Sequence, residues 1–278
     1  MATTDTDPIT SAPAGGGPWR VFTEDWDPAY GTPSTFEIDS SDDVSQVEPA
    51  DGLLPPTDVA MTPLCFIDGC RRAELSLWAE QAATGARVPG LAGAYAVGAV
   101  TTRPGGQASY AGVRVGRLAI WGGGHTGDIV ARTGHRWASE SIATDEPADL
   151  LAHLQDRMRM AEGALALDAA DAGWNVVLDG PLNRIRSLHS LVTGYVKTHH
   201  RRILPPEAHA LVPTLPIGGR SPLHTAGIDR YSCYVRVGSP GPGGSPWGGI
   251  ARLEFPASAG LDAAVDRATQ LAGLLPHF

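Results

Sequence analysis

The stretch PLCFIDGCRR, residues 63–72, decides the fold that we expect for this chain. Its apolar residues are typical of a buried strand that ends at Asp68, and Gly69 permits the chain to turn immediately afterwards. A carboxylate at the tip of a buried strand is costly in free energy unless something positive compensates it. We therefore expect Asp68 to have a bound cation or a hydrogen-bonded partner.

The same pattern occurs once more at NVVLDGPL, residues 175–182. An apolar strand again leads into Asp-Gly, here Asp179 and Gly180, and Pro181 follows as a helix-starting residue. Either Asp-Gly unit alone is more often only a turn. Two such units, separated by a long helix that carries an acid, instead favour the metal site of a nuclease.

Residues 149–171 give the clearest helical pattern of the chain. Glu162 lies at the edge of the inward apolar stripe, four residues after Met158 and three before Leu165. We predict Glu162 as the helix acid of the site, although three other acids nearby compete for this role: Asp156, Glu140 and Glu146.

The remaining pattern predicts an α/β fold, an RNase-H-like mixed sheet flanked by helices. Several short strands joined by glycine-containing turns favour an antiparallel meander in the first half. The elements expected around the helix are strands at 72–82, 91–100, 113–121, 174–179, 231–237 and 250–255, a basic helix at 181–201 and an apolar helix at 261–274. In such a fold, acids on the first strand, the long helix and the next strand converge at one end of the sheet.

Asp68, Glu162 and Asp179 form the candidate catalytic and metal-binding set. Carboxylates held together raise one another's pKa unless divalent cations occupy the site. Two ions about 3.5–4 Å apart activate a water and stabilise the leaving oxygen of a phosphodiester. Carboxylate oxygens are hard ligands that suit Mn²⁺ or Mg²⁺ rather than structural zinc.

Several blocks of this sequence resemble the NurA nuclease family. They are FIDGCRR at 66–72, the helix with Glu162, VVLDGPL at 176–182, GYVKTHH at 194–200 and ARLEFP at 251–256. The resemblance implies an RNase-H-like, Mn²⁺-dependent nuclease that acts on single-stranded DNA from the 5′ end and also endonucleolytically. It also implies a homodimer that docks on a hexameric HerA-type ATPase, and metal binding by Asp68, Glu162 and Asp179.

The chain departs from the family pattern at two places. Cys70 stands where many relatives have serine, which neither adds nor removes a hard ligand. The family places a histidine near its C-terminus within the active site, and His277 is a poor match to it. By RNase-H analogy, Asp262 or Asp266 is a further candidate for a fourth carboxylate.

The candidate DNA-binding residues lie in two basic stretches. Arg71 and Arg72 follow the first Asp-Gly unit, as a phosphate clamp or as a solvated pair. The stretch from 182 to 202 contains no acid, which favours DNA-backbone contact over an ordinary exposed face. Within it we select Lys197, His199, His200 and Arg201, with DNA chiefly single-stranded or at duplex ends as the expected partner.

The charge of the chain divides it near residue 60. Residues 1–60 hold one basic residue against twelve acidic ones, whereas residues 61–278 are close to neutral. We expect 1–60 to be an acidic, partly disordered N-terminal arm with an aromatic cluster from Trp19 to Tyr30, and 61–278 to be the nuclease-like domain. Three cysteines without a paired spacing, no recognisable signal peptide and no long apolar run favour a cytoplasmic protein that does not enter a membrane.

Two other functions stay open on the sequence alone. One is a non-catalytic adaptor that keeps the fold and docks a hexameric DNA-translocating ATPase. The other is an RNase-H-like phosphotransferase or an RNA-specific nuclease. The sequence does not distinguish the polarity of digestion, or DNA repair from defence against phage.

Overall fold

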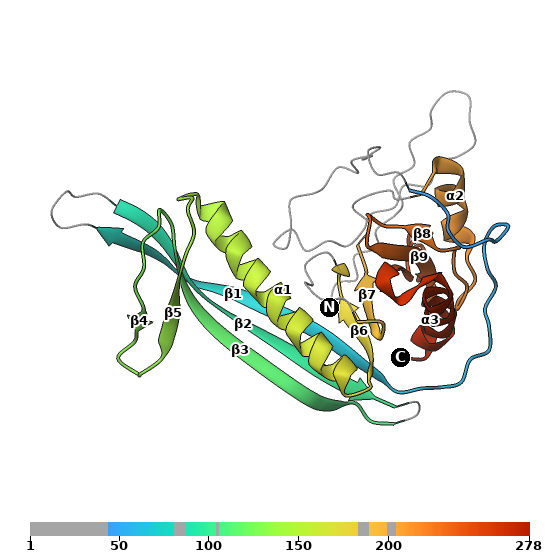
Figure 1. Ribbon diagram of the computed structural model, residues 1–278, viewed down its shortest axis with the longest axis horizontal. Helices are drawn as coiled ribbons and strands as arrows, with labels where there is room; N and C mark the ends of the chain where they lie inside the picture. The colour runs from blue at the N-terminus through green and yellow to red at the C-terminus, as the bar shows by residue number, and fades with distance from the viewer. Residues whose placement is uncertain (1–43, 81–86, 104–105, 183–188, 199–203) are drawn as a thin grey trace, which may run out of the picture.

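Ten strands of the described part of the chain form one sheet, in the order β4-β5-β3-β2-β1-β6-β7-β10-β9-β8 (Figure 1). The computed structural model describes residues 44–80, 87–103, 106–182, 189–198 and 204–278. The strands are β1 (Leu64–Glu80), β2 (Arg87–Thr102), β3 (Ser109–Trp121), β4 (Ile129–Val130), β5 (Arg136–Ser141), β6 (Asn175–Asp179), β7 (Val192–Val196), β8 (His224–Thr225), β9 (Arg230–Arg236) and β10 (Ile250–Pro256). The α-helices are α1 (Pro147–Asp171), α2 (Pro206–Leu211) and α3 (Leu261–Leu274), and short 3-10 helices are η2 (Val212–Thr214), η3 (Ala257–Ala259) and η4 (Leu275–His277).

The pairing of the strands confirms the predicted fold class. β1, β2 and β3 form an antiparallel meander, and β6 then pairs in parallel with β1 on its other side. β7 pairs in parallel with β6, and β10 pairs antiparallel with β7. The fold is therefore a mixed α/β sheet flanked by helices, of the RNase-H-like class. No helix among the described residues is long and apolar enough to span a membrane.

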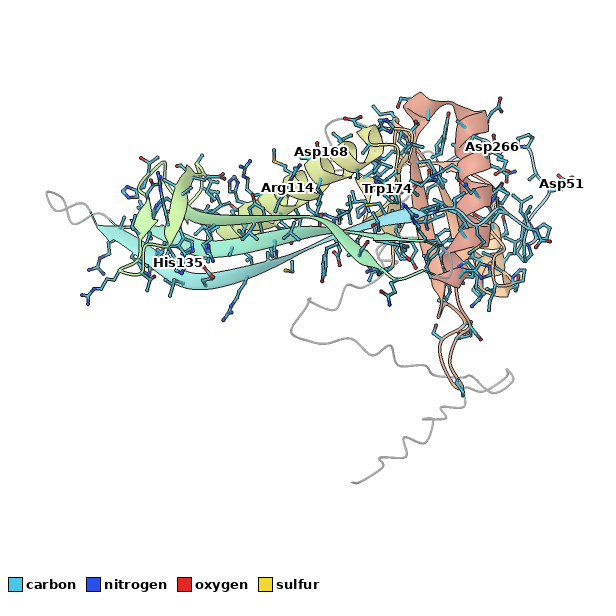
Figure 2. All side chains as sticks on the ribbon, turned by 90° about the horizontal axis from the view of Figure 1, so that it is seen from below. Asp51, Arg114, His135, Asp168, Trp174 and Asp266 are labelled. Atoms are coloured by element: carbon cyan, nitrogen blue, oxygen red, sulfur yellow. The ribbon has the colours of Figure 1, made fainter. Side chains whose placement is uncertain are left out.

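Two helices cover opposite faces of the sheet. α1 packs through Met158 and Leu165 against Ile67 and Leu178, whereas α3 packs through Leu271 on the core that contains Val177. Successive strand residues point to opposite faces, so residues 65 and 67 of β1 face α1, and residues 64 and 66 face the other way. Figure 2 shows α1 along one side of the long strands β1–β3; on their other side, α3 packs only on the start of β1, at Leu64.

The predicted turn at Gly69 is wrong. β1 runs without interruption from Leu64 to Glu80, and Gly69 pairs with Val97 of β2 inside the ladder. Residues 72–80 of the expected hairpin partner thus continue the same strand, with a β-bulge between Ala73 and Leu75, and the last two residues of the expected strand, 81 and 82, lie outside the described residues. Gly69 serves to leave space for a side chain of α1, because a Cβ atom there would lie 2.6 Å from Oε1 of Glu162.

The predicted helix over 181–201 is also wrong where the structure describes that segment. Residues 192–196 form β7, between β6 and β10, and 183–188 and 199–203 lie outside the described residues. The sequence of β7, VTGYV, is rich in β-branched and aromatic residues, and its backbone is hydrogen-bonded on both sides. Tertiary pairing therefore outweighs the helical spacing of the apolar residues.

An ion pair joins the segment before β1 to the sheet. Glu48 and Arg220 are both buried, and Arg220 donates from Nη1 and Nη2 to the two carboxylate oxygens at 2.7 and 2.8 Å. The backbone N–H of Leu223 donates to the same carboxylate at 2.9 Å. Residues 44–59, part of the arm expected from the sequence, therefore contact the sheet through Glu48. Residues 1–43 lie outside the described residues. The division of the chain at residue 60 stays a prediction.

Replacing Arg220 by Met should lower the free energy of unfolding by about 3–5 kcal/mol, because it leaves a buried carboxylate without its partner. Urea unfolding measures the change. The control is Arg136→Ala, which removes an exposed pair with Asp128 and should cost less than about 1 kcal/mol. Equal losses in the two variants would contradict the role given to the buried pair.

The pH dependence of stability gives a second readout of the same pair. Burial alone would raise the pKa of Glu48, but the Arg220 and Leu223 hydrogen bonds outweigh it and hold this pKa below its ordinary value. A lowered folded-state pKa contributes stability above the unfolded-state pKa, and this contribution is lost as the pH falls through the folded-state value. Acid unfolding of Arg220→Met should accordingly show a weaker dependence on pH in that range.

Candidate active site

The two strand aspartates occupy neighbouring positions on adjacent parallel strands. Ile67 of β1 lies opposite Leu178 of β6, so the same register places Asp68 beside Asp179 one residue later. Neighbouring strands are about 4.8 Å apart, and residues in register point to the same face. Asp179 ends β6, as predicted, whereas Asp68 lies within β1 and accepts a hydrogen bond from the N–H of Gly69 at 2.7 Å.

The third acid, Glu162, approaches β1 from α1. Its side chain is 1% exposed, and Oε1 lies where a Cβ atom of residue 69 would be. Oε2 accepts a hydrogen bond from Nη1 of Arg159 at 2.7 Å, whereas Oε1 is buried without a hydrogen-bond partner. Glu140, a competitor named from the sequence, instead pairs with His153 and Arg157.

The pKa of Glu162 reflects this environment. Burial, the largest cause, raises it; the charge and hydrogen bond of Arg159 lower it; and the negative charges of Asp68 and Asp179 raise it further, so that the net direction is upward. The three predicted acids, from β1, α1 and β6, are thus close enough to act on one another's charge.

Two basic side chains compensate the acids. Arg159 bridges Glu162 and the backbone carbonyl of Asp179, to which its Nη1 donates at 2.6 Å. Lys197, the only lysine of the chain, lies just after β7 with its Nζ 2.9 Å from Oδ1 of Asp179. Burial would lower the pKa of Lys197, but the hydrogen bond and charge of Asp179, with the charge of Asp68, raise it on balance.

Arg159 is a site residue that the sequence analysis missed. Its spacing of three residues from Glu162 on a helix was the available signal, because such residues share a face. The guanidinium fits here because Gly180 has no side chain: a Cβ there would lie 1.9 Å from Nη2 of Arg159. Gly180 also has a φ of +85° and β6 ends at Asp179, so the chain leaves the regular strand at this Asp-Gly unit, whereas Gly69 stays inside β1.

Glu254 is a second missed residue, and it fixes the loop that follows Asp179. It is buried on β10, and its Oε2 accepts hydrogen bonds from the N–H of Leu182 at 2.9 Å and from Arg230 at 3.1 Å. Arg252 pairs with its other oxygen at 2.7 Å. This network positions the loop rather than supplying a further free carboxylate.

The two arginines after Asp68 point to opposite faces of β1. Arg71 lies on the α1 face and donates from Nε to Gln155. Arg72 is exposed and shares the face of Asp68, because residues 68, 70 and 72 alternate with those that face α1. Arg72 is therefore better placed than Arg71 to contact a substrate. His199, His200 and Arg201 lie outside the described residues.

The fourth-ligand candidates lie at different places. Asp266 lines a cavity with Asn175, the first residue of β6, so about 13 Å of strand separates that end of β6 from Asp179. Asp262 is one helical turn earlier on α3. The C-terminal residue Phe278 packs edge-on against Phe66, two residues before Asp68, with ring centroids 5.8 Å apart. His277 is thus carried to the strand of Asp68, whereas Asp266 is not beside the acids.

No protein-family profile matches the sequence, and no curated protein matches it either. Among solved structures, the NurA nuclease from Sulfolobus solfataricus is similar, with 12% sequence identity and a TM-score of 0.48 over 80% of this chain and 76% of that chain. A likeness of this degree carries no argument about activity.

The donor chemistry of the site suits a hard divalent cation, but its ligands are not gathered into a cluster. Within the described residues, no three His, Cys, Asp or Glu side chains are grouped as metal ligands. Glu162 and Asp179 each already pair with a basic side chain, Arg159 and Lys197. Among the three acids, Oε1 of Glu162 is the buried oxygen that lacks a hydrogen-bond partner. A carboxylate oxygen is the type of ligand that hard divalent cations bind.

The space above Gly69 gives a direct test of the contact between β1 and α1. Gly69→Ala should lower the free energy of unfolding by about 1–3 kcal/mol, because the new methyl group overlaps the Glu162 carboxylate. The matched control is Gly98→Ala on β2, directly opposite Asp68, where an added Cβ meets nothing within 4 Å. Urea unfolding compares them. A Gly69→Ala variant as stable as Gly98→Ala would show that Glu162 does not occupy this position.

Proposed function

We propose that this protein is a metal-dependent nuclease that hydrolyses phosphodiester bonds of DNA. The observation that carries the proposal is that Asp68, Asp179 and Glu162 are close enough for their charges to interact: two aspartates in register on adjacent strands and, on the α1 side of the sheet, a buried glutamate with an unpaired oxygen next to Gly69. Carboxylates near one another repel, and one of the three, Glu162, is also buried, so their proximity is better explained by a charged ligand than by stability alone.

The three acids would hold one or two Mn²⁺ or Mg²⁺ ions. Such an ion, when bound, lowers the pKa of a water and stabilises the charge that develops on the leaving oxygen. Arg159 holds the Glu162 carboxylate in place and ties it to the end of β6. Lys197, whose side chain is 58% exposed, is positioned to pair with a phosphate oxygen next to Asp179.

Asp68→Ala should reduce Mn²⁺-dependent cleavage of labelled single-stranded DNA by more than about 100-fold, because it removes a ligand and unbalances the two remaining acids. Gel analysis of the products measures the rate. Asp51→Ala, at an exposed position in the segment before β1, is the control and should cleave normally. Calorimetry should show Mn²⁺ binding to the wild type and to Asp51→Ala but not to Asp68→Ala. Cleavage that survives Asp68→Ala would exclude this site.

The different faces of Arg71 and Arg72 give a separate test of substrate contact. In EDTA, where no cleavage occurs, Arg72→Ala should weaken binding of single-stranded DNA and reduce the slope of log K against log salt by about 0.7, the loss of one phosphate contact. Arg71→Ala, which alters the α1 face, should leave that slope unchanged. Fluorescence anisotropy over a salt series compares the two. An equal effect of both substitutions would contradict the assignment of Arg72.

A non-catalytic adaptor is the second candidate, and the ion pairs of the site favour it. Arg159 with Glu162 and Lys197 with Asp179 already balance the acids, as they would in a purely structural charge network. In this case the protein would serve as a docking subunit for a hexameric, HerA-like ATPase. The Mn²⁺ calorimetry above separates the candidates, because an adaptor of this kind binds no divalent ion at Asp68.

The partners of either activity follow from the exposed surface of the sheet. On the face of β3 away from α1, Val113 and Val115 are neighbouring apolar side chains that are 61% and 62% exposed. Exposed apolar residues that are contiguous mark protein interfaces. They support a homodimer as the working form, which the molar mass from light scattering tests. A cytoplasmic location and a role in DNA end processing belong to the same proposal.

A further inference from the structure

Arg267 of α3 is a buried charge that has no carboxylate partner among the described residues. The residue is 8% exposed, and its guanidinium donates to Oγ1 of Thr193, to Oε1 of Gln270 and to the carbonyl of Leu191, each at 3.3 Å. All three acceptors are neutral, and 3.3 Å is long for a hydrogen bond from nitrogen to oxygen. Burial lowers the pKa of Arg267 to about 10, so the side chain still carries its charge at neutral pH.

The other deeply buried arginines of the described chain are better satisfied. Arg220 has both oxygens of Glu48 at 2.7 and 2.8 Å. Arg236 donates to four backbone carbonyls at 2.6 to 2.9 Å. A buried cation that lacks such partners lowers the stability of the fold by several kcal/mol, because its loss of hydration is not compensated. Arg267 therefore has the weakest pairing of the three arginines, and an anion would compensate its charge.

A shallow, open cavity of about 570 Å³ on the surface is lined in part by Arg267. Its polar lining is Asn175, Ser190 and Gln270, and an apolar wall comes from Val59, Ala60 and Ala263. A volume of this order matches sites for small organic ligands. Asp266, on the same helix as Arg267, also lines the cavity, and no ion pair joins its carboxylate to the arginine.

The cavity is separate from the three acids. Asn175 begins β6 and Asp179 ends it, so about 13 Å of strand lies between the two sites. Figure 2 shows Asp266 at the end of the molecule opposite His135, on the helix α3 that packs across the sheet from α1. A ligand here binds whether or not the acids hydrolyse DNA.

We propose that this cavity binds a small organic anion, with its phosphate or carboxylate group on Arg267. A guanidinium recognises such oxyanions through two parallel hydrogen bonds, and Asn175, Ser190 and Gln270 supply further donors at neutral side chains. Asp266 accepts a hydroxyl or amino hydrogen from the same ligand and disfavours a bare, highly charged ion. The apolar wall accommodates a sugar, base or hydrocarbon portion of the ligand.

Calorimetry on the full-length protein tests the site with three anionic probes: 2′-deoxyadenosine 5′-monophosphate, inorganic phosphate and glutarate. Deoxyadenosine is the neutral control. We expect the nucleotide or glutarate to bind and deoxyadenosine not to bind. Binding of the nucleotide would identify a phosphate as the anionic group of the ligand, and binding of glutarate would identify a carboxylate. Asp266→Asn should tighten the binding of inorganic phosphate several-fold, because it removes the nearby negative charge. No binding of any anionic probe at millimolar concentration would overturn the proposal.

Two substitutions locate the anion on Arg267. Arg267→Gln should weaken binding of the nucleotide or glutarate at least about tenfold, the loss of one charge-assisted contact. Ser190→Asp, at an exposed turn that lines the cavity, supplies a carboxylate to pair with Arg267. This variant should have a higher melting temperature and should not bind the anion. It tests the site even if Arg267→Gln does not fold. Ser239→Asp, at an exposed loop elsewhere, is the matched control. Undiminished anion binding by Ser190→Asp would exclude this cavity.

Discussion

The rest of the structure depends on the close approach of α1 to β1, where Glu162 lies against the backbone of Gly69. A carboxylate that is almost wholly buried requires compensation, and Arg159 provides it while also binding the carbonyl of Asp179. One ion pair thus ties the helix to two strands. Around it, the apolar contacts of Met158 and Leu165 with Ile67 and Leu178 supply the free energy that holds the charges together.

The same contact explains why two similar sequence units have different structures. Both Asp-Gly pairs follow apolar strand residues, but only Gly180 has the positive φ that a turn needs. Gly69 remains in the ladder because the space above it is taken by a side chain from a distant helix. Glycine in a sequence indicates either unusual backbone geometry or a missing Cβ, and the second requirement depends on a neighbour that the local pattern does not contain.

Much of the fold could be predicted from periodicity, including α1, α3, the meander strands β2 and β3 and the sheet class, because their apolar patterns are long, whereas the unbroken course of β1 through Gly69 could not. The acids Asp68, Glu162 and Asp179 could be named from their positions on those elements, and they lie within range of one another's charge without being grouped as metal ligands. The segment of β7 could not, because five residues paired on both sides owe their conformation to neighbours. Arg159 and Glu254 were missed because their roles lie in contacts with backbone groups of other elements.

The uninterrupted course of β1 gives the two aspartates unequal freedom. Asp68 lies within β1, paired with Gly98 of β2, and β6 pairs with β1 up to the preceding residue, Ile67. Asp179 stands at a strand end, next to a glycine in the left-handed region and in contact with the exposed amine of Lys197. The backbone at Asp179 and Gly180 therefore has more freedom than that of Asp68. If an ion or ligand binds at the acids, the side of Asp179 adjusts to its size while β1 keeps its position.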